Sequence, residues 1–293
     1  MKTWIFFFWF PLHIFSQNFW TKDSIPNCKK TWLLAGTSLG VIGGLYTYTG
    51  ISWYSNIPKT KFHFFDDSKE WKQMDKVGHS WTAYQESKMI NELMIWAGYN
   101  RGVRGITTAL AGFTFQLPLE YFDGYTEKWG ASVTDIIANA SGSLLAAANV
   151  WTFDKQLIQL KFSFHPTIYS KRFPNLFGTG ISTVFKDYNG QAYWLCIDMK
   201  ELFFSQTKFP KWLNFSLGYG AQGLEGGYGK TDKSILQLRE FRQWYLAPDI
   251  NFSKIRTQKA VIKILFFVLD TIHFPLPALE YNKHHLRWHW IYF

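Results

Sequence analysis

Cysteine is scarce in this chain, which contains only Cys28 and Cys196. Two thiols so far apart in the sequence form neither a disulfide framework nor a metal-binding motif, so we expect both to be unpaired. Acidic residues are also in the minority, because 21 Asp and Glu stand against 31 Lys and Arg and give a net charge of +10. Such a chain could bind nucleic acid or anionic lipid. No helix-turn-helix, zinc-finger or RNA-recognition pattern is present, so we expect no nucleic-acid partner.

Aromatic residues, in contrast, are abundant. The 28 Phe, 15 Trp and 15 Tyr make up 20% of the chain. Trp and Tyr combine an apolar body with a polar tip, which suits the boundary between lipid and water. Composition therefore favours membrane lipid as a partner, and another envelope membrane protein is the second class of partner that fits.

The N-terminus has the pattern of an export signal. Lys2 is followed by an uncharged, mostly apolar run over residues 4–15 and then by Ser16. This pattern predicts that residues 1–16 are a secretory signal peptide or, if they are not cleaved, an anchor. The residues before Cys28 lack the small residue that a lipoprotein signal places there. We expect an exported, membrane-associated protein of the bacterial cell envelope, at the outer membrane or the periplasmic face.

Residues 31–155 are predicted to form a helical core. No charged residue occurs over residues 31–58, and residues 32–54 are long enough to span a bilayer or to pack as a buried helix through their small residues. Three more helices are predicted, at about residues 75–99, 105–119 and 129–151. The second of these is expected to end at Pro118. Together these segments predict a membrane-associated four-helix bundle.

The chain changes character over residues 156–293, which are aromatic and basic. Short aromatic runs alternate with turn signals, so antiparallel strands are predicted here. The fold class is therefore expected to be mainly α in the N-terminal half and α+β in the C-terminal half. Residues 193–198 also resemble residues 244–249, and either two equivalent strands or chance explains this echo.

Two further patterns in this region predict no site. Residues 218–223 have the spacing GxGxxG, but poor helix material follows them, and a dinucleotide site needs a helix there. His285 and His289 would lie about 13 Å apart on a strand, which is too far for one metal ion. We expect these histidines to pack at an interface.

Six polar residues lie within or beside the apolar helices of the first half and form the candidate functional site: Asp75, His79, Glu120, Asp123, Asp135 and Asn139. Asp75 and His79 are four apart and share a helix face, and so do Asp135 and Asn139. Ionisable groups are costly in apolar surroundings unless they are paired, so we expect these side chains to meet inside the fold. His79 could then act as a base or a ligand, and the carboxylates could hold a divalent cation.

Structural roles would explain the same residues one at a time. Asp75 could be the N-cap of its helix, and Asp135 and Asn139 could form hydrogen bonds between helices. The sequence identifies no reaction. The convergence of His79, Glu120 and Asp135 is the geometric observation that separates a shared site from a scaffold.

The order of these motifs resembles two known families. Residues 75–79 (Asp-Lys-Val-Gly-His), 120–124 (Glu-Tyr-Phe-Asp-Gly) and 135–142 carry the resemblance. They are similar to YfiM-type bacterial envelope proteins, which are predicted periplasmic lipoproteins without an established activity. The same order is similar to VanZ-like membrane proteins, some of which are linked to glycopeptide resistance. The resemblance covers about residues 70–150 and implies an envelope location.

Two functions follow from these observations. The first is a lipid- or partner-binding envelope protein that supports assembly or cell-surface integrity. The alternative is an enzyme or resistance-type factor that acts on a lipid-linked or phosphate-containing envelope substrate. In that case His79 would be a base or a ligand, Asp75 would orient it, and the other carboxyl groups would act as acids or metal ligands.

Overall fold

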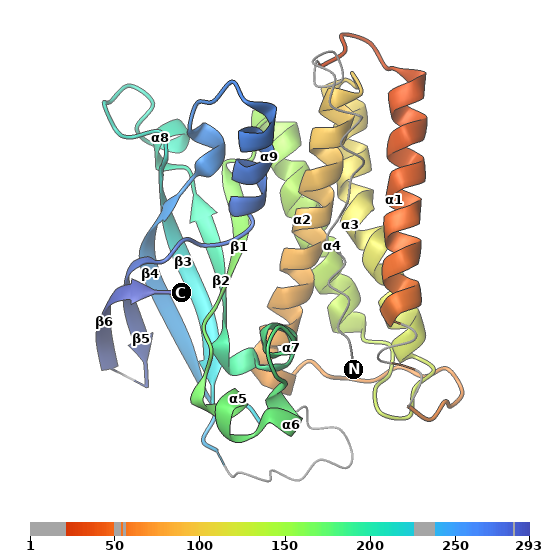
Figure 1. Ribbon diagram of the computed structural model, residues 1–293, viewed down its shortest axis with the longest axis vertical. Coiled ribbons are helices and arrows are strands. Elements are labelled where there is room, and N and C mark those ends of the chain that lie inside the picture. The colour runs from red at the N-terminus through yellow and green to blue at the C-terminus, as the bar shows by residue number, and fades with distance from the viewer. Residues whose placement is uncertain (1–21, 50–53, 55–56, 226–237, 284) are drawn as a thin grey trace.

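The computed structural model describes residues 22–49, 54, 57–225, 238–283 and 285–293. The predicted signal peptide or anchor at residues 1–16 lies outside these residues. A helical half and a sheet half lie side by side (Figure 1). Helices dominate the N-terminal half and an antiparallel sheet the C-terminal half, which confirms the α+β prediction. Association of the helices with a membrane stays a prediction.

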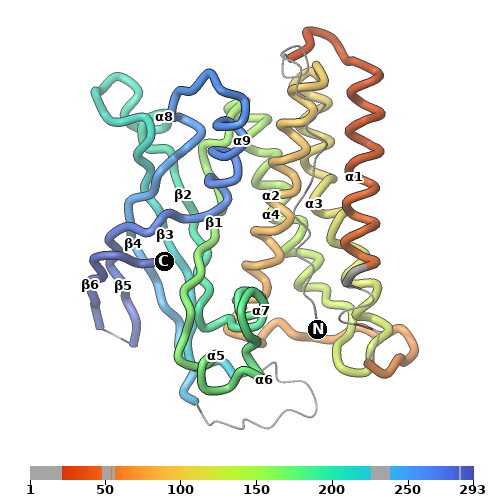
Figure 2. The backbone as a smooth tube through the Cα atoms, in the orientation of Figure 1, coloured from red at the N-terminus to blue at the C-terminus, as the bar shows by residue number. Residues whose placement is uncertain are grey.

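Four long helices form the helical half: α1 (Cys28–Thr49), α2 (Met74–Trp96), α3 (Arg101–Asp123) and α4 (Val133–Phe153). A short helix, η3 (Glu70–Gln73), precedes α2. The central helix is α2, because it packs against α3 and α4 and also contacts the sheet, whereas α1 stands at the outer edge of the bundle (Figure 1, Figure 2). Side chains of α2 can therefore contact both the other helices and the sheet.

Several helix ends differ from the sequence prediction; the third long helix, for example, begins at Arg101 and not at residue 105. The third long helix continues through Pro118 to Asp123, although Pro118 was expected to end it. Proline lacks one N–H donor but has a φ angle that a helix accepts, so the surrounding turns can remain helical. The fourth helix begins at Val133 and not at Trp129, because the side chain of Ser132 caps its first turn.

Small residues let the three inner helices approach closely. A Cβ added to Gly112 of α3 would lie 2.0 Å from the carbonyl oxygen of Ala83 on α2. A Cβ added to Gly142 of α4 would lie 2.0 Å from the carbonyl oxygen of Ser80, also on α2. Both glycines are therefore required for backbone contact with α2, and this contact brings the polar residues of the three helices together.

Six antiparallel strands form the sheet in sequential order: β1 (Ile158–Phe164), β2 (Gln191–Ile197), β3 (Leu213–Gln222), β4 (Phe241–Ile250), β5 (Leu276–Asn282) and β6 (His285–Tyr292). Short helices occupy the connections: α5 (Ile168–Arg172), α6 (Pro174–Phe177), α7 (Ser182–Lys186), η4 (Tyr188–Gly190), α8 (Met199–Leu202), η5 (Phe252–Lys254) and α9 (Ala260–Leu269). The echo between residues 193–198 and 244–249 falls on β2 and β4.

The sheet curls around an aromatic core on its inner face. Trp194 on β2 lies 5.9 Å from Tyr292 on β6, measured between ring centroids, although three strands separate them in the sheet. Residues 271–273 also pair with the free edge of β1, where the Phe162 N–H donates to the Thr271 carbonyl (3.1 Å). The inner face is therefore enclosed, and buried side chains from several strands meet there.

The outer face of the sheet is shared between the helices and solvent. Phe162 and Tyr193 lie 5.2 and 6.3 Å from the ring of Trp81 on α2. Farther along the same face, Trp244 and Trp288 are exposed. The contact with α2 thus joins the two halves, and an apolar aromatic surface continues beyond it.

Within the described part of the chain, α4 is the one helix that is long and apolar enough to cross a membrane. In its most apolar stretch, 44% is buried inside the protein. The segment expected to span a bilayer, residues 32–54, forms α1 as far as the structure describes it, and α1 does not meet that criterion. A bilayer contact for α1 stays a prediction.

Candidate functional site

The candidate site lies where α2 and α4 begin and α3 ends, at one end of the bundle (Figure 1). Asp75 occupies the first turn of α2. It is not the N-cap that the sequence allowed, because Gln73 holds that position and makes no side-chain capping bond. Glu120 and Asp123 lie in the last turn of α3 and not after it, because α3 is longer than expected. Three helices therefore direct polar side chains into one region.

His79 is fixed by Asn139 and faces two carboxylates. Its Nδ1 lies 3.1 Å from Asn139 Oδ1. An amide oxygen only accepts hydrogen bonds, so Nδ1 donates and Nε2 carries the lone pair of the neutral ring. Nε2 lies 3.9 Å from Asp75 Oδ1 and 3.9 Å from Asp135 Oδ2. Asp75, His79, Asp135 and Asn139 thus lie together in the structure, and their role as a functional site stays a prediction.

Lys76 supplies positive charge next to the imidazole. Its Nζ lies 2.5 Å from Asp67 Oδ2, 3.0 Å from Asp75 Oδ2 and 2.8 Å from Asp135 Oδ1. The side chain of Lys76 is only 11% exposed. One ammonium group therefore faces three carboxylates. Its charge neutralises only one of them, and the cluster keeps an excess of negative charge.

Lys76 was not predicted as a site residue, and neither were two cluster members from outside the long helices. Asp67 comes from the loop before α2, and it also accepts hydrogen bonds from the hydroxyls of Ser132 (2.6 Å) and Thr134 (2.9 Å). Tyr188 comes from η4 in the sheet half, and its hydroxyl donates to Asp75 Oδ1 (2.9 Å). No local sequence pattern joins these residues to the helices. Only the position of Asp67 shortly before the motif at residues 75–79 could have suggested it.

The excess negative charge shifts the protonation of the cluster. Burial, with help from Asp75, raises the pKa of Asp135 to about 7. For His79, burial favours the neutral ring, but Asp75 and Asp135 outweigh burial and raise its pKa. Burial also opposes the charge of Lys76, yet the same two carboxylates raise its pKa, so the lysine remains charged. Without another cation, protons are drawn to the cluster near neutral pH.

Glu120 and Asp123 lie behind this group and not within it. Glu120 Oε2 accepts from the backbone N–H of Ser132 (2.9 Å), and Oε1 has no hydrogen-bond partner among the described residues. Burial raises the pKa of Glu120 to about 7. Asp123 accepts a hydrogen bond from the Tyr54 hydroxyl (2.8 Å), and burial raises its pKa to about 6. Glu120 therefore affects His79 through its charge, and Asp123 is occupied by Tyr54.

Three of the side chains could hold one metal ion. One ligand atom each from Asp75, His79 and Asp135 lie within 4.8 Å of one another. Zinc bonds to nitrogen and oxygen are about 2.0–2.2 Å long, so two ligand atoms of one ion can be at most about 4.4 Å apart. Both 3.9 Å separations from Nε2 meet this limit. One imidazole and two carboxylates suit Zn²⁺ or a related dication.

The region that carries this cluster matches a known protein family. Residues 63–150 match the family described as predicted periplasmic lipoprotein (DUF2279). These residues include every cluster member except Tyr188. No curated protein and no solved structure matches the chain. The family match supports an exported, envelope-associated location. It also shows that this region is similar to an uncharacterised family of predicted periplasmic lipoproteins.

Proposed function

We propose that this protein is an envelope-associated, metal-dependent factor whose helical half binds a divalent cation through His79, Asp75 and Asp135. The observation that carries the proposal is the position of His79 Nε2, which lies 3.9 Å from a carboxylate oxygen on either side. Asn139 holds the ring so that this nitrogen faces the carboxylates. A histidine fixed in this way through its other nitrogen is the usual arrangement of a metal ligand.

The charge of the cluster also favours a cation. Three carboxylates share the single ammonium group of Lys76. A divalent cation would replace the protons that the raised pKa values of His79 and Asp135 place there. A bound dication would neutralise the excess charge of the three carboxylates and, at an open coordination position, would bind a phosphate oxygen of a lipid-linked envelope substrate.

Calorimetric titration of Zn²⁺ into the metal-stripped, full-length protein tests this proposal. We expect one ion per chain, and His79→Gln should weaken binding by at least about 10-fold, because one of three ligands is lost. The matched control is His63→Gln, since His63 lies outside the ligand set and bonds the Lys61 carbonyl instead. Equal affinity in both variants would contradict the proposal.

A second candidate, a lipid- or partner-binding assembly factor, is favoured by a different observation. The solvent side of α3 and α4 is apolar: Ile106, Leu110, Ile137 and Leu144 are 60%, 57%, 61% and 51% exposed. Large apolar side chains exposed on neighbouring helices are a feature of surfaces that contact lipid or protein. Ile137→Lys should reduce flotation of the protein with phosphatidylcholine vesicles, whereas Ser141→Lys, at an exposed polar position of the same helix, should reduce it less. A loss of equal size in the two variants would count against a specific apolar contact.

A further inference from the structure

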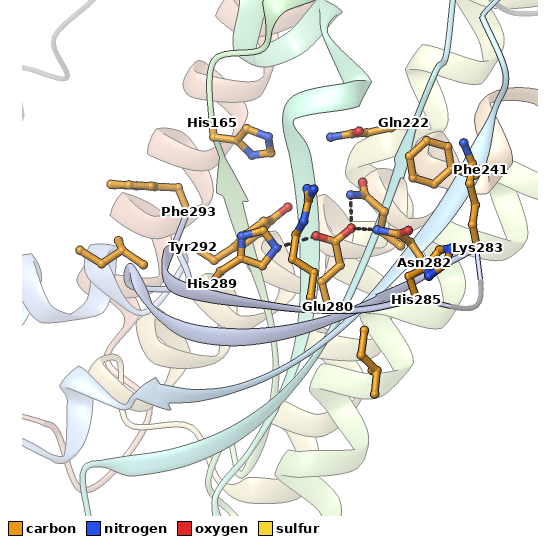
Figure 3. Close-up of a pocket in the computed structure, with 14 residues that line it drawn as sticks. His165, Gln222, Phe241, Glu280, Asn282, Lys283, His285, His289, Tyr292 and Phe293 are labelled. Atoms are coloured by element: carbon orange, nitrogen blue, oxygen red, sulfur yellow. Dashed lines mark hydrogen bonds and ion pairs between the residues drawn. The ribbon is translucent and has the colours of Figure 1, made fainter.

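A cavity on the inner face of β4, β5 and β6 contains a second group of charged residues, away from the metal cluster. It has a volume of about 670 Å³, and its lining includes Glu280, Lys283, Arg287 and His289 (Figure 3). Cavities of roughly 300–1,000 Å³ commonly hold small molecules. None of the residues assigned to the metal cluster lines this cavity, so the two sites can be tested separately.

A buried carboxylate forms the floor of the cavity. Glu280 is 2% exposed and lies 2.6 Å from His289 Nε2, and it accepts hydrogen bonds from the side chains of Gln243 (2.6 Å) and Asn282. Burial alone would raise the pKa of Glu280, but these three partners lower it. The carboxylate is therefore ionised and fully engaged. It gives the cavity a rigid polar floor and leaves no free carboxylate for a cationic ligand.

The walls carry two positively charged side chains, Lys283 and Arg287, against the single carboxylate of Glu280. Arg287 stands opposite Glu280 in the register of β5 and β6, on the cavity side of the sheet. Within the ranges that the structure describes, neither Arg287 nor Lys283 forms an ion pair. Lys283 instead lies over the ring of Phe241, with Nζ 3.8 Å from its centroid. The wall also contains His165, whose Nδ1 is buried and has no hydrogen-bond partner among the described residues.

We propose that this cavity binds a phosphate-bearing ligand, with Arg287 and Lys283 contacting the phosphate. Guanidinium groups bind phosphate oxygens through two parallel N–H donors, and lysine adds a point charge. Phe241 and Gln222 line the same cavity and would contact the rest of the ligand. The cavity accommodates a ligand about the size of a phosphorylated sugar or of a lipid headgroup.

The two sources of phosphate are separated by using two probes on the full-length protein. Glycerol 3-phosphate in calorimetry represents a soluble ligand. Flotation with phosphatidylcholine vesicles, with and without phosphatidylglycerol, represents a headgroup. Arg287→Gln should weaken binding of the effective probe by at least about 10-fold, because a charged hydrogen-bond pair is lost. Arg256→Gln is the matched control, because Arg256 is exposed and does not line the cavity.

Saturable binding of glycerol 3-phosphate that Arg287→Gln weakens, and Arg256→Gln does not, supports a soluble phosphate ligand. Flotation that requires phosphatidylglycerol and shows the same difference between the variants supports a headgroup. The absence of both, or equal losses in the two variants, overturns the proposal. Arg287→Lys keeps the charge without the paired donors and should give an intermediate affinity, which separates a lost contact from a misfolded sheet.

Discussion

Each half of the molecule buries a lysine among carboxylates, and the two clusters differ in how their charge is balanced. In the sheet, Lys161 lies 2.8 Å from Asp249 and 3.4 Å from Asp270, and these side chains are 0%, 0% and 1% exposed. In the helical half, Lys76 meets three carboxylates, and His79 beside them remains 18% exposed. The sheet cluster is closed to solvent, whereas the helical cluster is partly accessible.

Backbone groups complete the sheet cluster. Lys161 Nζ also donates to the Ile250 carbonyl (2.8 Å), and Asp270 accepts from the backbone N–H groups of Phe252 (2.7 Å) and Ser253 (2.9 Å). These bonds tie β1, β4, η5 and the end of α9 together. The helical cluster has instead an additional carboxylate and an imidazole nitrogen aimed between two acids. Backbone donors thus satisfy much of the sheet cluster, whereas the excess carboxylates of the helical cluster are those that the proposed cation would neutralise.

The largest expected effect would come from breaking the sheet cluster. Lys161→Met leaves Asp249 and Asp270 buried without a cation, so the free energy of unfolding should fall by about 3–5 kcal/mol. The matched control is Lys155→Met, because Lys155 is 56% exposed and pairs with Glu201 at the surface. Losing that pair should cost at most about 1 kcal/mol. Urea denaturation measures both values, and similar losses would contradict the structural role of Lys161.

Metal addition should stabilise the folded protein through the helical cluster and not through the sheet cluster. At a free Zn²⁺ concentration 100 times the Kd, binding to the folded state alone adds about 2.7 kcal/mol to the free energy of unfolding. His79→Gln should remove this gain. Lys161→Met should retain the gain in stability, because no residue of the sheet cluster is a proposed metal ligand. Thermal unfolding with and without Zn²⁺ provides the measurement, and a gain that survives in His79→Gln would place the ion elsewhere.

The excess negative charge of the helical cluster should make the free energy of unfolding depend on pH. The pKa of Asp135 is about 7 in the folded state and near 3.8 in the unfolded chain, so the folded state binds more protons between these values. Stability of the metal-free protein should therefore decrease as pH rises from about 4 to 7. Asp135→Asn should flatten this decrease, by roughly 1–2 kcal/mol between pH 5 and 7. Asp66→Asn, an exposed control, should keep the slope, and an unchanged slope in Asp135→Asn would show that other groups carry it.

The smallest effect concerns thiol accessibility and does not involve a change in stability. Cys196 is buried beside the sheet cluster, where burial raises its pKa, whereas Cys28 is exposed. A maleimide reagent should therefore label Cys28 in the native protein and leave Cys196 unlabelled. In Lys161→Met, local opening of the sheet should expose Cys196 and speed its labelling. Rapid labelling of Cys196 in the unsubstituted protein would show that the sheet cluster is not closed.

Local patterns in the sequence predicted much of the helical half. Asp75, His79, Asp135 and Asn139 were recognisable because polar residues four apart in apolar helices are expected to face one another. Pro118 misled the helix prediction, because the bonds of the flanking turns outweigh one missing donor. Asp67 could not be foreseen from spacing, since a loop brings it to Lys76.

The sheet half was less predictable because, as for Asp67, its contacts join residues that are far apart in the sequence. Strands were recognisable from aromatic runs and turn signals, but the pairing of Glu280 with Arg287 across β5 and β6 depends on register, which a bulge in β5 also alters. His289 was expected to pack at an interface, and its Nε2 lies 2.6 Å from Glu280 Oε2, a contact across the two strands that its own sequence neighbours do not indicate. Contacts set by curvature and register cannot be read from one strand at a time.

Tyr188 gives the molecule a property that neither half has alone. Its hydroxyl reaches from η4 across to Asp75, and its ring lies 4.8 Å from Trp71 in η3, at the entrance to α2. The polar cluster of the helices is thus completed by a residue that lies more than a hundred positions later in the sequence. The two halves are consequently not interchangeable modules: a bundle transplanted without its own sheet would keep every residue of the family-like segment and still lack the hydroxyl that bonds Asp75.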